Sequence, residues 1–372
     1  MTIAKVVIII PTYNEAAVIQ ETLTAVFNAT RCIPNADIHV LIFDSASTDG
    51  TQRIVTDLVA SNVNLHLKTE LKKSGLGSAY LQAMRYALDE LSADIVFEFD
   101  ADLSHEPKYI APMLEKIKTC DVVVGSRYVA GGSIPADWGW HRKLMSVLGN
   151  WISRALLTSE YKDFTSGFRA TRRQALQDVL PEKFLSNHYA YKLELLWLLH
   201  KNNALICEYP IEFVDRQKGL SKLPANSVID SLRVLFILRY HEMKMYLKMC
   251  LVGASGMAVQ FLVYNLIRHY FTPFSSQAIA VTAAIINNFI LNSYFTFNKR
   301  PPVSHIDKAK SLVIFVAYSV GFVFLQSYWL QIGIRMIGAG VIKENFILVT
   351  GMIFGSLLNY FIYSRLVWGS RD

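Results

Sequence analysis

Two acidic residues, Asp100 and Asp102, stand one position apart directly after an apolar run that ends at Phe99. Carboxylates at this spacing can share one hard divalent cation such as Mg²⁺ or Mn²⁺, which prefers oxygen ligands and keeps positions open for phosphate oxygens. Such an ion screens the negative charge that develops on a departing diphosphate. Two acids also occur in ordinary solvated turns, so the pattern becomes informative only at the end of a parallel strand.

Two further polar segments, Pro11–Glu15 and Asp44–Thr51, also follow apolar runs. The first opens a predicted helix, whose start favours anionic ligands, and the ring of Tyr13 is able to cover a base or a ribose. Taken alone, this segment is explained better by helix capping through Thr12 or Asn14. The second segment is as easily a cap as a nucleotide contact, so both alternatives stay open.

Basic residues in the same part of the chain are candidates for binding phosphate: Arg127, Arg142, Arg216 and Lys222. An arginine fork binds phosphate oxygens in pairs, and a lysine supplies a point charge. Any one of them is more often a plain surface charge. Together with the acidic pair, they predict a site for two phosphorylated substrates.

The elements that must position these residues alternate between strand and helix. Strands are predicted at residues 5–10, 37–43, 63–67, 94–99, 120–125 and 204–214, and helices at 15–28, 50–61, 77–92 and 107–118. This alternation predicts a parallel sheet covered on both faces. Because such sheets bind ligands at the carboxyl ends of their strands, the acidic pair and both polar segments are expected to meet there.

The chain of 372 residues is 52% hydrophobic and 18% charged, but this average hides a split. Long apolar stretches begin after residue 244, and four of them reach the roughly 20 residues that cross a bilayer. They are residues 247–267, 275–297, 311–334 and 345–367. We therefore expect an α/β domain at 1–225, an interfacial helix or linker at 226–244 and a four-helix transmembrane domain at 245–372.

Two amphipathic segments precede the apolar stretches. Residues 141–157 carry apolar side chains at helical spacing behind Arg142 and Lys143, and they either pack on the sheet or lie at a membrane surface. Residues 228–240 carry Arg233 and Arg239 and lead directly into the first apolar stretch. For this second segment we favour the interfacial position.

Charge and cysteine content limit the partners and the compartment. The formal net charge is +7, yet no Lys/Arg-rich block stands out in the first part of the chain, which argues against nucleic acid as a partner. Lys299, Arg300, Lys308 and Lys310 lie between the second and third apolar stretches, so the positive-inside rule places the α/β domain and the C-terminus in the cytoplasm. The four cysteines show neither a CxxC motif nor a disulfide framework, which favours a reducing compartment.

Seven segments between residues 5 and 240 occur in the order typical of one enzyme family. They are Pro11-Thr12-Tyr13-Asn14-Glu15, Gly75-Leu76-Gly77-Ser78-Ala79-Tyr80, Asp100-Ala101-Asp102-Leu103-Ser104-His105, Gly125-Ser126-Arg127-Tyr128 with Gly131-Gly132, Arg142-Lys143, Ser166-Gly167-Phe168-Arg169, and Phe213-Val214-Asp215-Arg216 through Lys222. The domain resembles the family 2 inverting glycosyltransferases with a Rossmann-like GT-A fold, and within them the dolichyl-phosphate mannosyltransferases. The apolar region resembles the four-helix GtrA-like membrane domain through Asn288-Phe289 and Asn359-Tyr360.

The resemblance implies a reaction and its participants. Mannose would pass from GDP-mannose to a polyprenyl (dolichyl) phosphate with inversion at the anomeric carbon, with Mg²⁺ or Mn²⁺ as cofactor and the lipid bilayer as the location of the acceptor. Because a lipid phosphate is already anionic at neutral pH, this acceptor needs no general base. Positioning, metal and arginines can then supply the catalysis.

The resemblance also implies roles for particular residues. Catalysis would rest on Asp100, Asp102 and Arg127. The residues expected to bind the nucleotide sugar are Pro11, Tyr13, Glu15, Phe43, Asp44, Ser45, Asp100, Ala101, Asp102, Arg127, Arg216 and Lys222. Those expected to bind the lipid phosphate are Arg127, Arg142 and Ser146, and those expected to hold the metal are Asp100, Asp102 and Ser104.

Two positions depart from the family pattern and keep other functions open. The family usually has two adjacent acids after the second strand, where Asp44 is here followed by Ser45, and Ser104 stands where some relatives carry a metal-ligating glutamine. UDP-glucose or UDP-N-acetylglucosamine with undecaprenyl phosphate is therefore one alternative, although the match from Asp215 to Lys222 favours mannose. A lipid-carrier translocator with a catalytically silent head, suggested by the GtrA-like region, is another, against which the intact acidic pair and the basic residues argue. No Gln-x-x-Arg-Trp motif supports a processive polysaccharide synthase.

Overall fold

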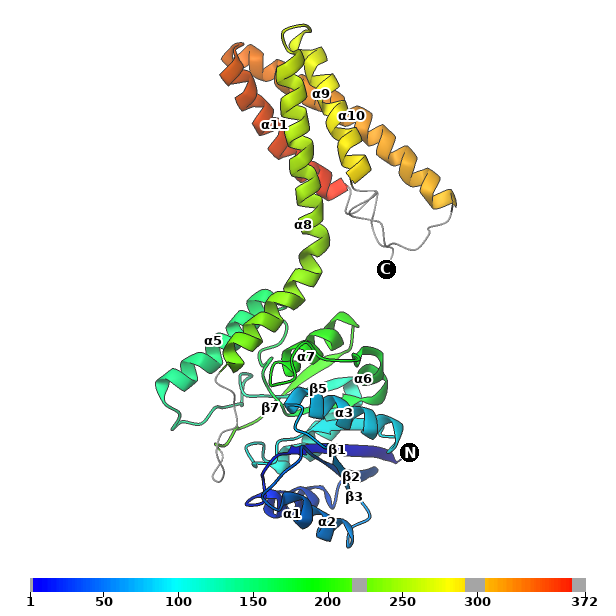
Figure 1. Cartoon of the computed structure of the whole chain (residues 1–372), viewed down its shortest axis with the longest axis vertical. Coiled ribbons are helices and arrows are strands. Elements are labelled where there is room, and N and C mark those ends of the chain that lie inside the picture. The colour runs from blue at the N-terminus through cyan, green and yellow to red at the C-terminus, as the bar shows by residue number, and fades with distance from the viewer. Residues whose placement is uncertain (1–2, 216–225, 292–304, 363–372) are drawn as a thin grey trace. The chain divides into compact units, whose positions relative to one another are not determined.

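A computed structural model of the chain describes residues 3–215, 226–291 and 305–362 (Figure 1). The chain divides into two compact units, Met1–His241 and Glu242–Asp372, which we call the α/β unit and the helical unit. The predicted linker at 226–244 falls within one continuous helix, α8 (Ser227–Ile267). Arg216 and Lys222, two of the predicted phosphate-binding residues, lie outside the described residues.

The α/β unit is built around a seven-stranded sheet with the order β3-β2-β1-β4-β6-β5-β7. The strands are β1 (Ala4–Thr12), β2 (Ala36–Asp44), β3 (Leu65–Thr69), β4 (Ile95–Glu98), β5 (Val122–Ser126), β6 (Arg169–Arg172) and β7 (Ile206–Pro210). The central strand β1 pairs in parallel with β2 and β4. Their carboxyl ends, and the loops that follow them, therefore lie at the same edge of the sheet.

Helices cover both faces of this sheet, because the side chains of β1 alternate between two apolar cores. Val7 and Ile9 enter the core that contains α3 and α7, whereas Val6 and Ile8 enter the core that contains α1 and α4. The helices and short 3₁₀ turns of this unit are α1 (Ile19–Thr30), α2 (Thr51–Val59), α3 (Leu76–Asp89), η1 (Pro107–Tyr109), α4 (Ile110–Lys116), η2 (Ile117–Thr119), α5 (Trp140–Leu156), α6 (Arg173–Val179) and α7 (Tyr191–Lys201). Burial on both faces explains why the strands read as continuous apolar runs.

The predicted parallel sheet contains one strand that the sequence did not predict, β6, and this strand runs antiparallel to both β4 and β5. This strand has only four residues and includes Arg169, so it lacks the apolar run that marks the other central strands. The guanidinium of Arg169 is fully buried, and its Nε lies 3.6 Å from Oε2 of Glu98, the directly opposite residue on β4. A charged residue is tolerated in the core here because the neighbouring strand supplies the opposite charge.

The spacing of the cysteines shows no disulfide framework, yet the structure contains one disulfide. Cys120 and Cys207 form a disulfide across a sequence separation of 87 residues. Cys207 lies on β7, which is the parallel neighbour of β5, while Cys120 lies two residues before the start of β5. Sequence spacing cannot show this approach, because it depends on the order of strands in the sheet. The cysteines therefore no longer favour a reducing compartment.

The helical unit contains the remainder of α8 followed by α9 (Pro273–Leu291), α10 (His305–Ile337) and α11 (Val341–Ile362). Within its described residues, three segments are long and apolar enough to cross a membrane: Leu247–Ile267, Pro273–Leu291 and Tyr318–Ile337. The fourth predicted stretch overlaps α11, whose side chains are described only as far as Gly355. Asn287 donates a hydrogen bond of 2.8 Å from Nδ2 to Oγ of Ser255 on α8, so this polar side chain joins two helices.

Candidate active site

A cavity of about 670 Å³ opens at the carboxyl ends of the strands in the α/β unit. The predicted site residues that line it are Pro11, Tyr13, Glu15, Ser45, Asp100, Ala101, Asp102, Ser104, Arg127, Arg142 and Ser146. We call Pro11, Tyr13, Glu15, Ser45, Lys73, Asp100 and Asp102 the strand-end wall, and Arg142, Met145, Ser146, Leu148 and Ile152 the α5 wall. Phe43 and Asp44 do not line the cavity, since both side chains are buried behind it.

The buried side chain of Asp44 holds the loops of the strand-end wall together by hydrogen bonds. Its fully buried carboxylate accepts hydrogen bonds from Oγ1 of Thr12 at 2.8 Å, from the backbone and hydroxyl of Ser47 at 2.9 and 2.6 Å, and from Nε2 of Gln52 at 2.6 Å. These contacts hold the loop after β2 against the end of β1. The adjacent Ser45, rather than Asp44, therefore presents its side chain to the cavity.

The two polar loops after β1 and β2 bind each other. The side chain of Asn14 accepts a hydrogen bond of 2.8 Å from the backbone of Thr48, and the backbone of Asn14 donates one of 2.8 Å to Oγ of Ser47. These contacts occupy the residues that the sequence offers as helix caps. As a result α1 starts at Ile19 and not at residue 15 as predicted, and it starts without a side-chain cap.

The loop that carries the acidic pair has an uncommon backbone conformation. Leu103 adopts a φ of +57°, Asp102 accepts a 3.1 Å hydrogen bond on Oδ1 from the backbone of Ser104, and Thr22 donates from its hydroxyl to the carbonyl of Ala101 at 2.6 Å. Left-handed backbone at a large apolar residue costs free energy and tends to occur at functional sites. The turn directs both carboxylates towards the cavity.

Asp100 lies beside two nitrogen-bearing side chains. Its Oδ2 is 3.7 Å from Nδ1 of His105 and 3.9 Å from Nζ of Lys192. His105 is stacked on Phe168 with ring centroids 5.1 Å apart, and burial lowers the pKa of the imidazole to about 4. The ring is therefore neutral at pH 7, and its buried Nδ1 has no hydrogen-bond partner among the described residues.

These residues fit a divalent cation whose coordination is completed by a substrate. Asp100, Asp102 and Ser104 supply oxygen atoms on one cavity wall, which suits Mg²⁺ or Mn²⁺. In the described part of the chain, no group of three or more His, Cys, Asp or Glu side chains is placed to hold a metal. An incomplete ligand set of this kind is typical of Mg²⁺ sites that use phosphate oxygens.

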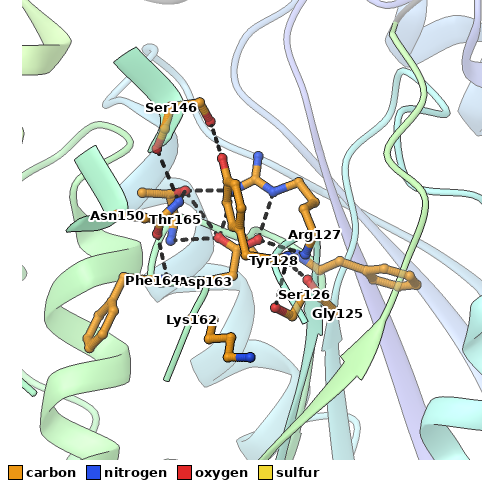
Figure 2. Close-up of polar contacts among 12 residues, drawn as sticks. Gly125, Ser126, Arg127, Tyr128, Ser146, Asn150, Lys162, Asp163, Phe164 and Thr165 are labelled. Atoms are coloured by element: carbon orange, nitrogen blue, oxygen red, sulfur yellow. Dashed lines mark hydrogen bonds and ion pairs between the residues drawn. The ribbon is translucent and has the colours of Figure 1, made fainter. Parts of the chain in front are cut away.

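Arg127 is held by a buried carboxylate, as Figure 2 shows. Its Nε and Nη2 each lie 2.7 Å from an oxygen of Asp163, Nη2 also donates to Oγ1 of Thr165 at 2.6 Å, and the backbone N–H of Arg127 donates to Asp163 at 3.0 Å. Burial alone would raise the pKa of Asp163, but the charge and hydrogen bonds of Arg127 lower it below its usual range. The pair stays ionised and fixes the guanidinium, which was predicted to meet phosphate, at the cavity lining.

The same segment anchors the α5 wall (Figure 2). Asn150 of α5 accepts a 2.9 Å hydrogen bond from the backbone of Phe164, and its Nδ2 lies 3.3 Å from Oγ1 of Thr165. One turn earlier, Oγ of Ser146 is 2.7 Å from the hydroxyl of Tyr128. The segment from Asp163 to Thr165 thus connects the end of β5 with α5.

Arg142 stands near the start of α5 and is only half-buried. Its two terminal nitrogens lie 2.8 and 3.1 Å from the carboxylate oxygens of Asp215, and its guanidinium stacks on Trp138 at 3.9 Å from the ring centroid. This arrangement presents a positive charge at the cavity while the aromatic ring supports it. A phosphate group entering the cavity would compete with Asp215 for the same guanidinium.

The α5 helix leaves most of its apolar side chains exposed. The large apolar residues that remain exposed are Trp140, Leu144, Met145, Val147, Leu148 and Trp151. Only Asn150 and Ser153 are buried on this helix, although Ile152 and Leu156 pack against the core. The sequence leaves two positions open for this helix, packing on the sheet or lying at a membrane surface. Because more of its apolar side chains are exposed than packed on the core, the membrane-surface position fits better. The segment 228–240 has both kinds of side chain: Val234, Leu235 and Leu238 are buried in the core of the α/β unit, whereas Val228, Ile229, Phe236 and Tyr240 are exposed.

Sequence reasoning missed several residues that shape the site. Lys73 places its Nζ 3.4 Å from the ring centroid of Tyr13, and both side chains line the cavity. Lys192 and His188 also line it, and Asp163 holds Arg127. Lys73 stands two residues before Gly75 of a recognised motif, which was the one available signal. Nothing local in the sequence distinguishes the others from surface charges.

Comparison with known proteins agrees with this geometry. The model of glycosyl transferase family 2 matches residues 7–180, and that of the GtrA/DPMS transmembrane domain matches residues 248–368. An undecaprenyl-phosphate mannosyltransferase from Micrococcus luteus is 35% identical over 224 residues, which cover 60% of this chain and 89% of the relative. A polyprenol monophosphomannose synthase from Mycolicibacterium smegmatis is 31% identical over 230 residues, which cover 61% and 84%.

A third relative extends the similarity over both units. A dolichol-phosphate mannosyltransferase from Pyrococcus furiosus is 28% identical over 372 residues, covering 98% of this chain and 100% of the relative. The two family models fall one in each unit, in the order in which the units occur. The chain therefore belongs to the family 2 glycosyltransferases of the dolichol-phosphate mannosyltransferase type, with a GtrA/DPMS transmembrane domain following its catalytic domain.

Proposed function

We propose that the protein transfers mannose from GDP-mannose to a polyprenyl phosphate, with inversion at the anomeric carbon, and releases GDP. The observation that carries this proposal is a single cavity that joins the acidic pair of the strand-end wall to the basic and apolar α5 wall. A nucleotide sugar suits the first wall, and a phosphate on a lipid suits the second. The relatives are named for mannose transfer involving undecaprenyl phosphate, polyprenol and dolichol phosphate.

The strand-end wall would bind the donor. Asp100 and Asp102, with Ser104, would hold Mg²⁺ or Mn²⁺ against the diphosphate, and the bound ion would screen the charge that develops on departing GDP. Tyr13 and the ammonium of Lys73 lie together at 3.4 Å on this wall, where the ring can cover the nucleoside and the ammonium can meet a phosphate. Predicted donor contacts from Arg216 and Lys222 remain part of the proposal.

Arg127 would provide a fixed positive charge to the reacting groups. Because Asp163 and Thr165 already hold its guanidinium, no reorganisation is needed as negative charge shifts during transfer. The acceptor phosphate is anionic at neutral pH, so no residue has to remove a proton before it attacks. Attack would come from the side opposite GDP, which produces inversion.

The α5 wall would bind the acceptor. Arg142 and Ser146 would contact the lipid phosphate, and the exposed side chains of Trp140, Leu144 and Trp151 would enter the lipid surface. This places the acceptor phosphate where polyprenyl phosphates are found, at the boundary of the bilayer. A catalytically silent translocator would not require this two-walled cavity.

The membrane topology that we propose has four spans, with α11 as the fourth. It places the α/β unit and the C-terminus in the cytoplasm, where nucleotide sugars are made. The support comes from the basic residues Lys299, Arg300, Lys308 and Lys310 between the second and third apolar stretches of the sequence. The Cys120–Cys207 disulfide gives no support to this orientation, which therefore depends on charge alone.

The test is transfer of radiolabel by the purified full chain in detergent with Mn²⁺ or Mg²⁺. GDP-mannose, UDP-glucose and UDP-N-acetylglucosamine are offered in parallel with a short polyprenyl phosphate, and label is counted in the organic phase. We expect label from GDP-mannose only, in a product with the β configuration. Label from a UDP-sugar alone would mean that the donor is that UDP-sugar, and Ser45 would then account for the different nucleotide specificity. No label from any donor would contradict the proposed reaction.

A further inference from the structure

Lys192, in the first turn of α7, brings a positive charge close to Asp100 of the acidic pair. Its Nζ lies 3.9 Å from Oδ2 of Asp100, and its side chain is only 8% exposed. The same side chain lines the cavity. A lysine in this position occupies part of the space around the carboxylate that a divalent cation would use.

Gly167 creates the room for this ammonium group. A Cβ added at Gly167 would lie 2.1 Å from Nζ and 2.8 Å from Cε of Lys192, closer than any real contact, and 3.5 Å from Oδ2 of Asp100. The base of the side chain is fixed separately, because Nη2 of Arg169 donates to the carbonyl of Lys192 at 3.2 Å. The lysine therefore reaches Asp100 because residue 167 has no side chain.

We propose that Lys192 is a positioning residue that makes binding of the divalent cation depend on the diphosphate of the donor. The ammonium satisfies Asp100 when no substrate is present and repels a second cation, since charges a few Å apart in a partly buried site interact strongly. A nucleoside diphosphate brings several negative charges, which offset this repulsion and give the ammonium another partner. The cation and the nucleotide would then bind cooperatively. This inference rests on the proposed donor site.

The experiment measures Mn²⁺ binding by electron paramagnetic resonance, with the purified full chain in detergent and with or without GDP. Without GDP, Lys192→Met is expected to bind Mn²⁺ on the order of tenfold more tightly than the wild type, because one repelling charge is gone. GDP is expected to strengthen Mn²⁺ binding to the wild type much more than to Lys192→Met. Lysine and methionine have similar lengths, so the packing around the stem is retained.

Two further variants separate the charge from the fold. Gly167→Ala keeps the lysine and displaces its ammonium from Asp100, so it should also strengthen Mn²⁺ binding in the absence of GDP. Lys201→Met removes the same charge from the exposed last turn of the same helix, and it should leave Mn²⁺ binding unchanged. Melting curves of all variants show whether each one is folded.

Equal Mn²⁺ affinity of the wild type and Lys192→Met without GDP would overturn the inference. Failure of every folded variant, the wild type included, to bind Mn²⁺ would overturn it together with the metal site. The expected Mn²⁺ behaviour in a protein that transfers no mannose would leave the role of Lys192 standing and contradict the proposed function alone. The binding measurement and the transfer measurement therefore test the two proposals separately.

Discussion

The two walls of the cavity are built by different means. The strand-end wall follows strands whose side chains are buried on both faces, and its loops are joined by buried hydrogen bonds to Asp44. The α5 wall is an amphipathic helix that buries only Asn150 and Ser153. A rigid wall suits a reaction that needs metal and diphosphate in fixed positions, whereas a mostly exposed helix suits a lipid surface. The Arg127–Asp163 pair stands at the junction of the two.

Removing Asp163 should have the largest effect, because it breaks that junction. Asp163→Ala leaves the guanidinium of Arg127 buried without its carboxylate, and loss of one partner of a buried ion pair costs about 3–5 kcal/mol. The measurement is thermal and denaturant unfolding of the full chain in detergent. The double variant Arg127→Ala/Asp163→Ala should lose less than the sum of the two single variants. Strict additivity would show that Arg127 and Asp163 do not stabilise each other.

Removing the disulfide tests whether the sheet holds the strand-end wall in place without this cross-link. Cys120 and Cys207 join the start of β5 to β7, at the opposite end of β5 from Arg127. Replacing both by serine should lower the free energy of unfolding by about 2–4 kcal/mol, as loss of a long disulfide loop typically does. Mannose transfer below the melting temperature should be unchanged. A loss of transfer without a loss of stability would show that the disulfide shapes the site directly.

Asn150 tests the α5 wall by itself. In Asn150→Ala the buried N–H of Phe164 loses its acceptor, which costs about 1–3 kcal/mol. Since α5 is then less firmly held, the KM for polyprenyl phosphate should rise by about tenfold, while the KM for GDP-mannose should change little. An equal rise in both KM values would mean that the two walls are not independent.

Glu194 gives the smallest predicted effect, on α7 behind the strand-end wall. Burial raises the pKa of its carboxyl to about 7, although a 2.7 Å hydrogen bond from the backbone of Leu185 opposes the shift. A raised folded pKa means that the folded chain holds the proton more tightly, so stability is greatest at low pH and falls as the pH rises through 7. We therefore expect the free energy of unfolding to be lower at pH 8 than at pH 5 because of this group. The isosteric Glu194→Gln should lack this loss, and an identical pH profile in both proteins would refute the assignment.

The sequence predicts the strand-end wall well because its signals are local. The apolar runs of β1, β2 and β4 identify the strands, and Tyr13, Ser45 and Asp100, which follow them, line the cavity. The strand predicted at 94–99 is observed as Ile95–Glu98. The start of α1 is displaced because the residues before it bind the loop after β2, which is a contact between distant segments.

The Arg127–Asp163 junction and the other buried charges of the α/β unit could not be predicted from such local signals. Arg169 is compatible with a buried strand only because Glu98 lies opposite, and Asp163 acquires its role only when Arg127 is beside it. Lys192 is one lysine of a helix that is apolar on nearly every side, so no periodicity marks it. In each case the role of the residue depends on a partner that is distant in the sequence, so the residue alone does not reveal it.

The most direct test of the account compares the wild type with Asp102→Asn in the transfer of labelled mannose from GDP-mannose to a polyprenyl phosphate. Glu106→Gln is the matched control, because it makes the same carboxylate-to-amide change four residues later, outside the cavity lining. We expect Asp102→Asn to lose at least about 100-fold in kcat, with Glu106→Gln and the wild type alike and EDTA abolishing transfer by both. Undiminished transfer by folded Asp102→Asn, or by the wild type in EDTA, would contradict a metal-supported reaction at the strand-end wall.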